Sequence, residues 1–145
     1  MKALIQRVSS AEVIVDGDQI GAIDQGLVVL LGVERQDTVE VADRLLQKIV
    51  RYRVFSDSDG HMNLSVTDIA GSLLVVSQFT LAADTQKGLR PSFSSAMSPE
   101  LAERLYDHFV QAAGLLVPVQ QGQFGATMSV SLINEGPVTF MLSAR

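Results

Sequence analysis

The chain lacks cysteine and tryptophan altogether, and it has only two histidines among 145 residues. Without cysteine it can form no disulfide, offer no thiolate nucleophile and build no cysteine metal site. The absence of cysteine is compatible with a reducing compartment, so we expect a cytoplasmic protein.

Long hydrophobic runs are also missing, because no apolar stretch approaches the roughly 20 residues of a bilayer-spanning helix. The first seven residues turn polar at Gln6, before the apolar core of a signal peptide could form. We therefore expect neither a membrane span nor a secretion signal.

Several chemical motifs are absent as well. His61 and His108 belong to no HExxH pair, and the chain has no G-x-S-x-G elbow, no phosphate-binding P-loop and no dinucleotide glycine fingerprint. We therefore expect neither a metal ion nor a cofactor. The formal net charge of −5 argues against broad adhesion to DNA, other nucleic acid or anionic membrane, although a local basic patch remains compatible with it.

What is present is the composition of a globular domain, with 47% hydrophobic and 19% charged residues. At this length we expect one domain spanning residues 1–145. The order of apolar patterns predicts mostly strands with two well-separated helices. This order favours an α+β fold in which the helices lie on one side of a curved antiparallel or mixed sheet.

Strands are expected where the sequence alternates or runs apolar over short stretches. They fall at residues 3–8, 12–15, 19–23, 27–33, 54–55, 73–81, 117–121, 127–133 and 138–142. Asp16-Gly17 predicts a hairpin turn, and residues 134–137 predict a tight connection between the last two strands.

Helical spacing of apolar residues predicts the two helices. The first is expected to begin after an Asp37 N-cap, to end near Tyr52 and to bury Val41, Leu45, Leu46 and Ile49. The second is expected to begin at Ser98-Pro99, to end at Gly114 and to bury Leu101, Leu105, Phe109 and Ala112.

Residues 73–81 form the most informative stretch. Leu73-Leu74-Val75-Val76 has the length of a strand buried on both faces, and polar residues then interrupt it at Ser77, Gln78 and Thr80. One interpretation is a strand end whose polar side chains cap a turn. The other is a strand that delivers hydrogen-bond donors to a reaction site. The pattern alone favours the first interpretation, because most such residues are structural.

An enzyme with this inventory would depend on positioning and backbone donors, because no evident base lies near Ser77 or Thr80 in the sequence. Backbone N–H groups at a strand end could stabilise the oxyanion of a carbonyl under attack, and Gln78 could add its amide. An activated ester, with a good leaving group, suits such equipment.

Two motifs resemble those of a known family. Ser77-Gln78-Phe79-Thr80-Leu81 and Asn134-Glu135-Gly136-Pro137-Val138-Thr139 resemble the SQFTL and NxGPVT signatures of the D-aminoacyl-tRNA deacylases. The resemblance covers essentially the whole chain. It implies a barrel-like sheet with two outer helices, and a cytoplasmic homodimer whose active site lies at the subunit interface. The implied activity is hydrolysis of D-aminoacyl-tRNA, and of glycine mischarged on tRNA, with rejection of L-aminoacyl-tRNA.

The resemblance assigns Ser77, Gln78 and Phe79 to holding the aminoacyl group, with the Phe79 N–H as an oxyanion donor. It leaves two roles open for the next residue. Thr80 is either a nucleophile, or catalysis is RNA-assisted and the 2′-hydroxyl of the terminal ribose activates water. We favour the RNA-assisted route, since no base for Thr80 is evident.

The resemblance also makes Gly136-Pro137 a chirality filter, with a cis peptide bond and carbonyls that enter the partner's pocket. From the residues alone a trans bond in a plain turn is expected, because most X-Pro bonds are trans. Asn134, Val138 and Thr139 complete this motif.

The resemblance further suggests that Arg7 holds the Gly-Pro element, although a lone arginine near a strand end is usually a solvated charge. In the long connection after residue 81, Lys87, Arg90 and Phe93 are the candidate tRNA contacts, Phe93 near the terminal adenine, and Lys2 is a further candidate phosphate contact. Two rival functions are a hydrolase of small D-amino-acid esters and a non-catalytic oligomer that binds a metabolite.

Overall fold

The fold is organised around one long strand, β1, in a computed structural model that describes residues 1–145. One edge of β1 (Lys2–Val15) pairs first with β3 (Gly26–Gly32) and then with β2 (Asp18–Ile23). The other edge pairs with β8 (Ser129–Ser143) along most of its length. Beyond β3 the sheet continues with β6 (Ser72–Ser77) and β7 (Val119–Gln121), both parallel to their neighbours. A separate two-stranded sheet joins β4 (Phe55–Ser56) and β5 (Met62–Leu64).

The six-stranded sheet curls until its ends nearly meet. A Cβ added to Gly21 in β2 would lie 2.9 Å from the Gln121 carbonyl oxygen in β7. The curl follows from the pronounced twist of long strands, and it gives the sheet a barrel-like form. The predicted α+β fold with a curved mixed sheet is confirmed.

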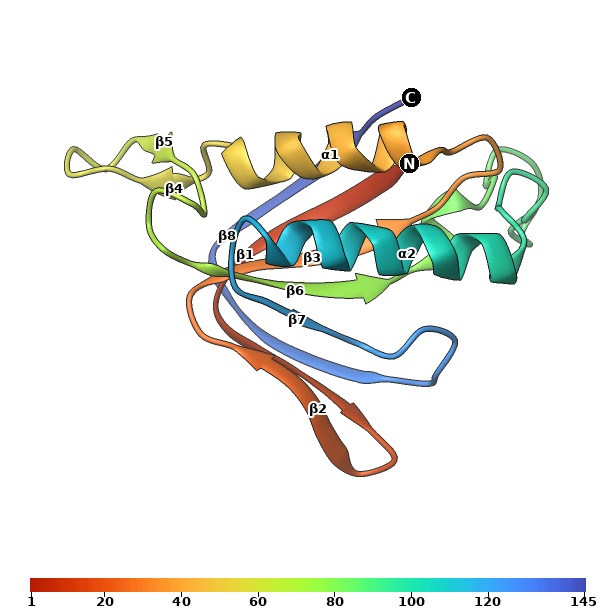
Figure 1. The fold of residues 1–145 in the computed structure, drawn as a ribbon, viewed down its shortest axis with the longest axis horizontal. Helices are drawn as coiled ribbons and strands as arrows, with labels where there is room; N and C mark the ends of the chain where they lie inside the picture. Colours follow the sequence, from red (N-terminus) through yellow and green to blue (C-terminus); the bar gives the residue numbers. More distant parts are fainter.

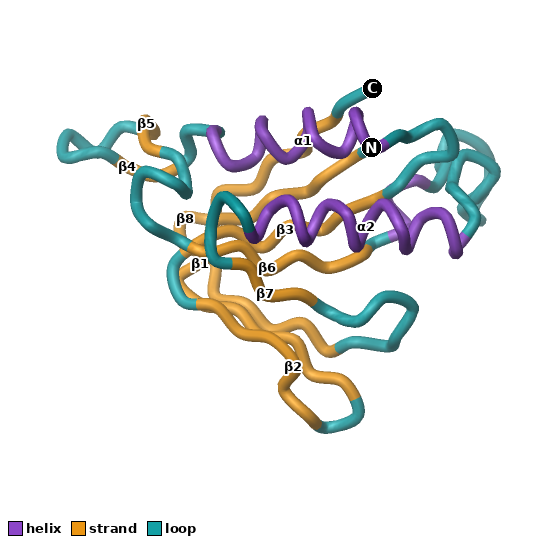
Figure 2. The backbone as a smooth tube through the Cα atoms, in the orientation of Figure 1, coloured by secondary structure: helices purple, strands orange, loops and turns teal.

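Both helices lie on the same outer face of the sheet (Figures 1 and 2). Helix α1 (Val39–Arg51) connects β3 to β6, and α2 (Pro99–Gly114) connects β6 to β7. Parallel neighbours require such crossovers, because a hairpin can join only antiparallel strands. None of the helices is both long and apolar enough to cross a bilayer.

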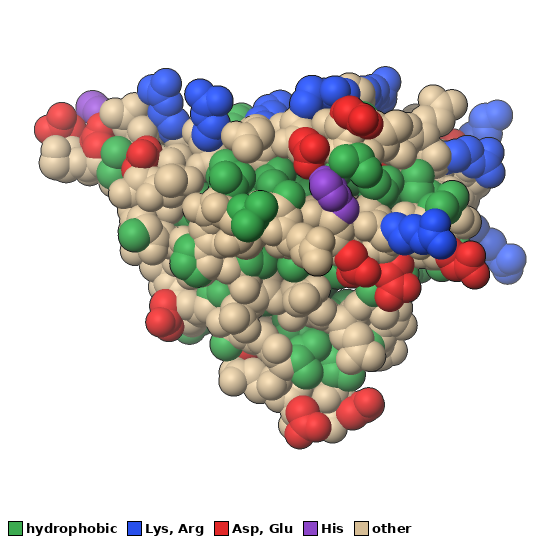
Figure 3. Space-filling view, in the orientation of Figure 1, with side chains coloured by type: hydrophobic (Ala, Val, Ile, Leu, Met, Phe, Trp, Pro, Cys, Tyr) green, Lys and Arg blue, Asp and Glu red, His purple; other side chains and the backbone are tan.

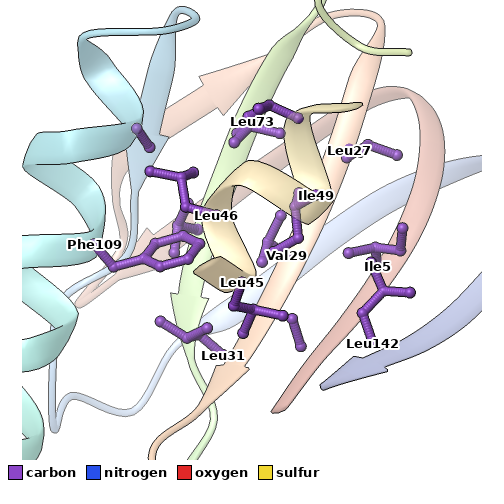
Figure 4. Packing of buried hydrophobic residues seen from close by; sticks show 14 of the residues in the cluster. Ile5, Leu27, Val29, Leu31, Leu45, Leu46, Ile49, Leu73, Phe109 and Leu142 are labelled. Atoms are coloured by element: carbon purple, nitrogen blue, oxygen red, sulfur yellow. The ribbon is translucent and has the colours of Figure 1, made fainter. Parts of the chain in front are cut away.

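Two apolar clusters hold the fold together. The larger lies between the helices and the sheet, where Leu45 and Ile49 of α1 and Phe109 of α2 meet Val29 of β3 and Leu73 of β6 (Figure 4). The smaller fills the inside of the curled sheet and includes Val8, Val13, Val28, Leu74 and Val76. Because its side chains alternate between the two clusters, β6 is buried on both faces, as predicted for residues 73–76.

The structure corrects two strand predictions. Residues 3–8 and 12–15 are parts of the single strand β1, and residues 127–133 and 138–142 largely join in the single strand β8. The predicted tight connection at residues 134–137 is therefore wrong, because β8 stays paired with β1 on both sides of it. The predicted hairpin at Asp16-Gly17 is confirmed, and both residues have positive φ, as a type I′ turn requires.

Two helix details also differ from the prediction. The N-cap of α1 is Thr38, whose hydroxyl accepts from the Val41 N–H at 3.3 Å, while Asp37 accepts from the N-terminal ammonium of Met1 at 2.7 Å. In α2 the buried face contains Leu105 and Phe109 as predicted, but Leu101 is 51% exposed and Ala112 only half-buried. The residues Ala102, Tyr106 and Ala113 take their place.

Candidate active site

The first candidate group lies where β6 ends. The strand stops at Ser77, Gln78 follows in an irregular conformation, and residues Phe79–Ala82 form a single 3₁₀ turn. The N–H groups of Phe79 and Thr80 stand at the start of this turn, where a helical turn supplies no carbonyl to accept from them. The predicted strand over residues 73–81 thus ends four residues early. Its end presents backbone donors, as the second interpretation of this stretch requires.

A pocket of about 420 Å³ opens beside this turn. Ser77 and Gln78 supply its polar side chains, and Phe79, Phe124 and Met128 belong to its mostly apolar wall. Its volume is in the range of small-molecule sites. No histidine, lysine or carboxylate lines the pocket.

The one side-chain hydrogen bond within the group joins the Gln78 amide to the Thr80 hydroxyl, with the amide N–H donating. A donor on the Thr80 oxygen occupies a lone pair and takes no proton from it. A threonine nucleophile needs a base that does take this proton. The observed contact does not supply one.

Gly32, which sequence reasoning did not single out, supports the turn from beneath. The Gln78 N–H donates to the Leu31 carbonyl at 2.8 Å. At the next residue of β3, a Cβ on Gly32 would lie 2.8 Å from the Leu81 Cβ and 3.2 Å from the Gln78 carbonyl oxygen. The turn therefore packs so closely on Gly32 that a larger residue there would have to displace it. A glycine inside a strand pattern often marks such a close approach.

Tyr106 is a second supporting residue that sequence reasoning missed. Its hydroxyl donates to the Val75 carbonyl at 2.9 Å, two residues before Ser77, and its ring centroid lies 5.9 Å from that of Phe124. Burial, helped by the nearby Asp107 carboxylate, raises the pKa of Tyr106 well above its usual range. The hydroxyl therefore stays protonated and keeps α2 attached to the strand that carries the site.

The second candidate group is a wide bulge in β8. Val8 pairs with Asn134 and Gln6 pairs with Thr139, so Arg7 alone stands opposite residues 135–138. The Gly136–Pro137 peptide bond in this bulge is cis, as the resemblance implies and contrary to the trans bond expected from the residues alone. Both residues are exposed.

Arg7 anchors the bulge. Its side chain is buried, and it donates from Nε to the Glu135 carbonyl at 2.9 Å and from Nη1 to the Val54 carbonyl at 2.7 Å. Gly136 has φ +136°, and a Cβ there would lie 2.8 Å from a Val138 methyl group and 3.3 Å from Arg7 Nη2. The solvated-charge interpretation of Arg7 is wrong.

The remaining residues of this motif frame the bulge. Val138 is buried beneath it, while Asn134 and Thr139 are exposed at its two ends. The Thr139 hydroxyl accepts from the Gln6 side-chain amide at 3.3 Å. The motif thus presents a rigid, exposed Gly-Pro corner that is held from below by Arg7 and Val138.

Within one chain the two groups lie apart. Ser77 pairs with Leu31, which pairs with Ala3, four residues along β1 from Arg7. At about 3.3 Å per residue this places the bulge roughly 13 Å farther along the strands than Ser77. The path from β8 through β1 and β3 to β6 adds about 14 Å across three strand spacings. The SQFTL group and the Gly-Pro group therefore form no single site in one chain.

The loop after the 3₁₀ turn carries the remaining candidates. Asp84 and Ser92 exchange backbone hydrogen bonds of 2.7 and 2.9 Å, which fix the base of this loop, and Lys87 and Arg90 are exposed on it. Phe93 returns to the site, where its ring centroid lies 5.2 Å from that of Phe79. Of the three predicted tRNA contacts, the fold thus brings Phe93 against the SQFTL group.

Comparison with known proteins identifies the family of this chain. Residues 4–143 match the family model described as D-Tyr-tRNA(Tyr) deacylase. The chain is similar to a D-aminoacyl-tRNA deacylase of Vibrio cholerae serotype O1, with 60% identity over 99% of this chain and 100% of the relative.

Two solved structures resemble this chain. One is described as c-Myc DNA Unwinding Element Binding Protein, with a TM-score of 0.95 and 42% identity over 100% of this chain and 99% of that one. The other is a probable eukaryotic D-amino acid tRNA deacylase, with a TM-score of 0.82 over 97% of each chain. Its identity of 17% shows a shared fold alone.

The family match and the curated relative define an ester hydrolase that acts on charged tRNA. Within that class, the chain belongs to the D-aminoacyl-tRNA deacylase family, whose model matches nearly its whole length. Its reaction is the removal of a D-amino acid from tRNA, a proofreading step.

Proposed function

We propose that this deacylase works as a homodimer in which the Gly136-Pro137 corner of one chain enters the Ser77–Phe79 pocket of its partner. The observation that carries the proposal is the separation of the two groups along the sheet. The outer edge of β8 supports it, because it pairs with no strand and carries the exposed apolar residues Ile133 and Met141. An open strand edge can pair with another chain, and exposed apolar residues mark interaction sites.

The Gly-Pro corner then acts as the chirality filter. Its exposed carbonyls hold the substrate's amino group and leave no space on the side where an L side chain would point. A D side chain points away, and glycine has none, so glycyl-tRNA also passes. This is selection by a steric penalty against the wrong enantiomer. The Arg7 hydrogen bonds to the bulge and to Val54 keep the corner rigid enough to impose it.

Catalysis is RNA-assisted in this proposal. The ribose 2′-hydroxyl of the terminal adenosine orients and activates a water molecule, which attacks the ester carbonyl carbon. The Phe79 N–H stabilises the oxyanion. The bond to the ribose 3′-oxygen then breaks as that oxygen takes the proton that the attacking water gives up by way of the 2′-hydroxyl. The support is the pocket without a base and the donor that already occupies the Thr80 oxygen.

Recognition of the tRNA is local in this proposal. Phe93 lies near the terminal adenine, and Lys87 and Arg90 contact phosphates. Basic side chains gather along the edge over α1 and at the end where the long loops lie, whereas the tip of the β1–β2 hairpin shows acidic side chains and no basic ones (Figure 3). Because charged tRNA is used in translation, we place the protein, as one domain, in the cytoplasm.

The direct test compares D-tyrosyl-tRNA, L-tyrosyl-tRNA, glycyl-tRNA and the ethyl ester of D-tyrosine as substrates of the purified protein. We expect release of the amino acid from the first and third only. Cleavage of the ethyl ester as well would favour a hydrolase of small D-amino-acid esters, and cleavage of none would favour a metabolite-binding oligomer. Sedimentation of the same sample should give the mass of a dimer, and a monomer would contradict the shared site.

Thr80→Ala is expected to keep kcat for D-tyrosyl-tRNA within about fivefold of the wild-type value, because removal of a true nucleophile costs several orders of magnitude. Neither the wild type nor Thr80→Ala should cleave a matched D-tyrosyl-tRNA that ends in 2′-deoxyadenosine at an appreciable rate. Single-turnover deacylation measures both rates. Complete loss in a folded Thr80→Ala protein, together with normal cleavage of the deoxy substrate, would instead identify Thr80 as the nucleophile.

A further inference from the structure

A second hollow adjoins the active-site pocket, and Phe79 stands between the two. The hollow has a volume of about 610 Å³ and shares Phe79, Ala96, Met97 and Pro99 with the pocket. The two spaces share these wall residues. A long ligand that occupies the pocket and extends past Phe79 would therefore reach into the hollow.

One side of the hollow is an exposed apolar wall. Phe79 is 59% exposed, Phe93 40% and Leu101 51%, and the two rings pack at 44° to one another. Helical spacing predicts Leu101 in the core of α2, but the fold turns it into this hollow instead. Flat aromatic and aliphatic surfaces of this kind suit the face of a nucleic acid base.

The other side of the hollow is polar and cationic. The loops at residues 33–38 and 83–98 lie side by side at the end of the molecule where both helices begin (Figures 1 and 2). The Arg35 N–H donates to the Ser95 carbonyl at 2.9 Å, which fixes the backbone at Arg35, and Arg35 lines both this hollow and a neighbouring one beside Glu34 and Asp37. Ser98 adds a hydroxyl that makes no capping hydrogen bond to α2.

The acidic residues next to Arg35 in sequence make their ion pairs with another group. The Glu34 carboxylate lies 3.1 Å from the Met1 ammonium, and the Asp37 carboxylate lies 2.7 Å from the same group. The Arg35 side chain has no hydrogen bond or ion pair of its own. A guanidinium and a hydroxyl beside an apolar wall match the phosphate and the base of one nucleotide.

We infer that this hollow binds the nucleotide that precedes the terminal adenosine of tRNA. Its base lies against Leu101 and against the side of Phe93 that faces away from the terminal adenine. The phosphate that joins it to the terminal adenosine accepts hydrogen bonds from Arg35 and Ser98. The inference rests on the proposed function, because it takes the terminal adenosine to occupy the pocket on the other side of Phe79. It assigns to Arg35 a contact that is separate from the Lys87 and Arg90 loop.

The test uses three D-tyrosyl esters as substrates: those of adenosine, of the dinucleotide cytidylyl-adenosine and of intact tRNA. Wild-type protein should gain about tenfold in kcat/KM from the added cytidylate, as expected for one charge-assisted contact. Arg35→Ala should lose this gain through a higher KM. For intact tRNA its plot of log(kcat/KM) against log salt should be shallower by about 0.7, the value for one phosphate of a single strand.

Arg51→Ala is the matched control, because Arg51 is also exposed but lies at the opposite end of α1. It should retain the gain from cytidylate and the wild-type salt slope. An Arg35→Ala protein with unchanged KM and slope on D-tyrosyl-tRNA would refute the inference and leave the proposed function standing. If Arg35→Ala protein instead sedimented as a monomer, the hollow would belong to the contact between subunits, and this result would also refute the inference. Wild-type protein that cleaves none of the esters would refute the proposed function itself.

Discussion

Arg7→Ala is expected to lower the free energy of unfolding by roughly 3–6 kcal/mol, because two hydrogen bonds from a buried charged group are lost and each is worth about 1.5–3 kcal/mol. The Glu135 and Val54 carbonyls would be left without these donors. The bulge that presents Gly136-Pro137 would then lose its anchor. We therefore also expect kcat/KM for D-tyrosyl-tRNA to fall at least tenfold and the ratio of D to L cleavage to shrink.

Urea unfolding at one fixed protein concentration measures the first effect, since a dimer's apparent stability depends on concentration. Deacylation of the two enantiomeric substrates measures the second. Arg104→Ala is the control, because Arg104 is exposed on α2 and should stay within about 0.5 kcal/mol of the wild-type value. Undiminished chiral discrimination in a destabilised Arg7→Ala protein would limit Arg7 to a structural role. An unchanged urea midpoint would contradict the anchoring itself.

Gly32→Ala is expected to lower kcat for D-tyrosyl-tRNA by about ten- to a hundredfold while the protein remains folded. The added methyl group would lie 2.8 Å from the Leu81 Cβ and 3.2 Å from the Gln78 carbonyl oxygen, so the 3₁₀ turn has to move. The Phe79 N–H moves with it, away from the position where the oxyanion forms. A displacement of about 1 Å at such a donor can cost a factor of one hundred.

Gly114→Ala is the matched control for this substitution. Nothing lies within 4 Å of a Cβ at Gly114, which ends α2 on the surface. Its deacylation rate should equal that of the wild type. Steady-state kinetics with both variants, together with their urea midpoints, separates a displaced turn from a destabilised fold. Gly32→Ala protein with kcat within twofold of wild type would show that the turn tolerates the shift.

Local patterns in the sequence were sufficient for most of the fold. The double-faced burial of residues 73–76, the Asp16-Gly17 hairpin and the two helices follow from spacing that neighbouring residues impose on one another. The errors arise where distant residues compete. Asp37 leaves the helix cap to Thr38, because the N-terminal ammonium, 36 residues away in sequence, binds its carboxylate.

The largest error, at residues 134–137, has the same origin. Gly-Pro usually interrupts a strand, so the sequence predicts a turn there. In the fold, β1 pairs with β8 on both sides of the bulge, and Arg7 donates to the carbonyl of Glu135 inside it. Pairing between strands more than 100 residues apart in sequence therefore overrides the local preference.

The sequence by itself determined three things. Its two motifs indicated the family, its apolar patterns indicated a mixed α+β fold, and its composition offered no obvious base or metal ligand. Only the tertiary structure decided how the motifs are placed, with Ser77–Thr80 at the end of β6 and Gly136-Pro137 three strands away. It also decided that Gly32 and Tyr106 support the site and that Arg7 is buried. The physical reason is that register, burial and close backbone approach depend on which distant segments pack together. No local spacing of residues encodes that information.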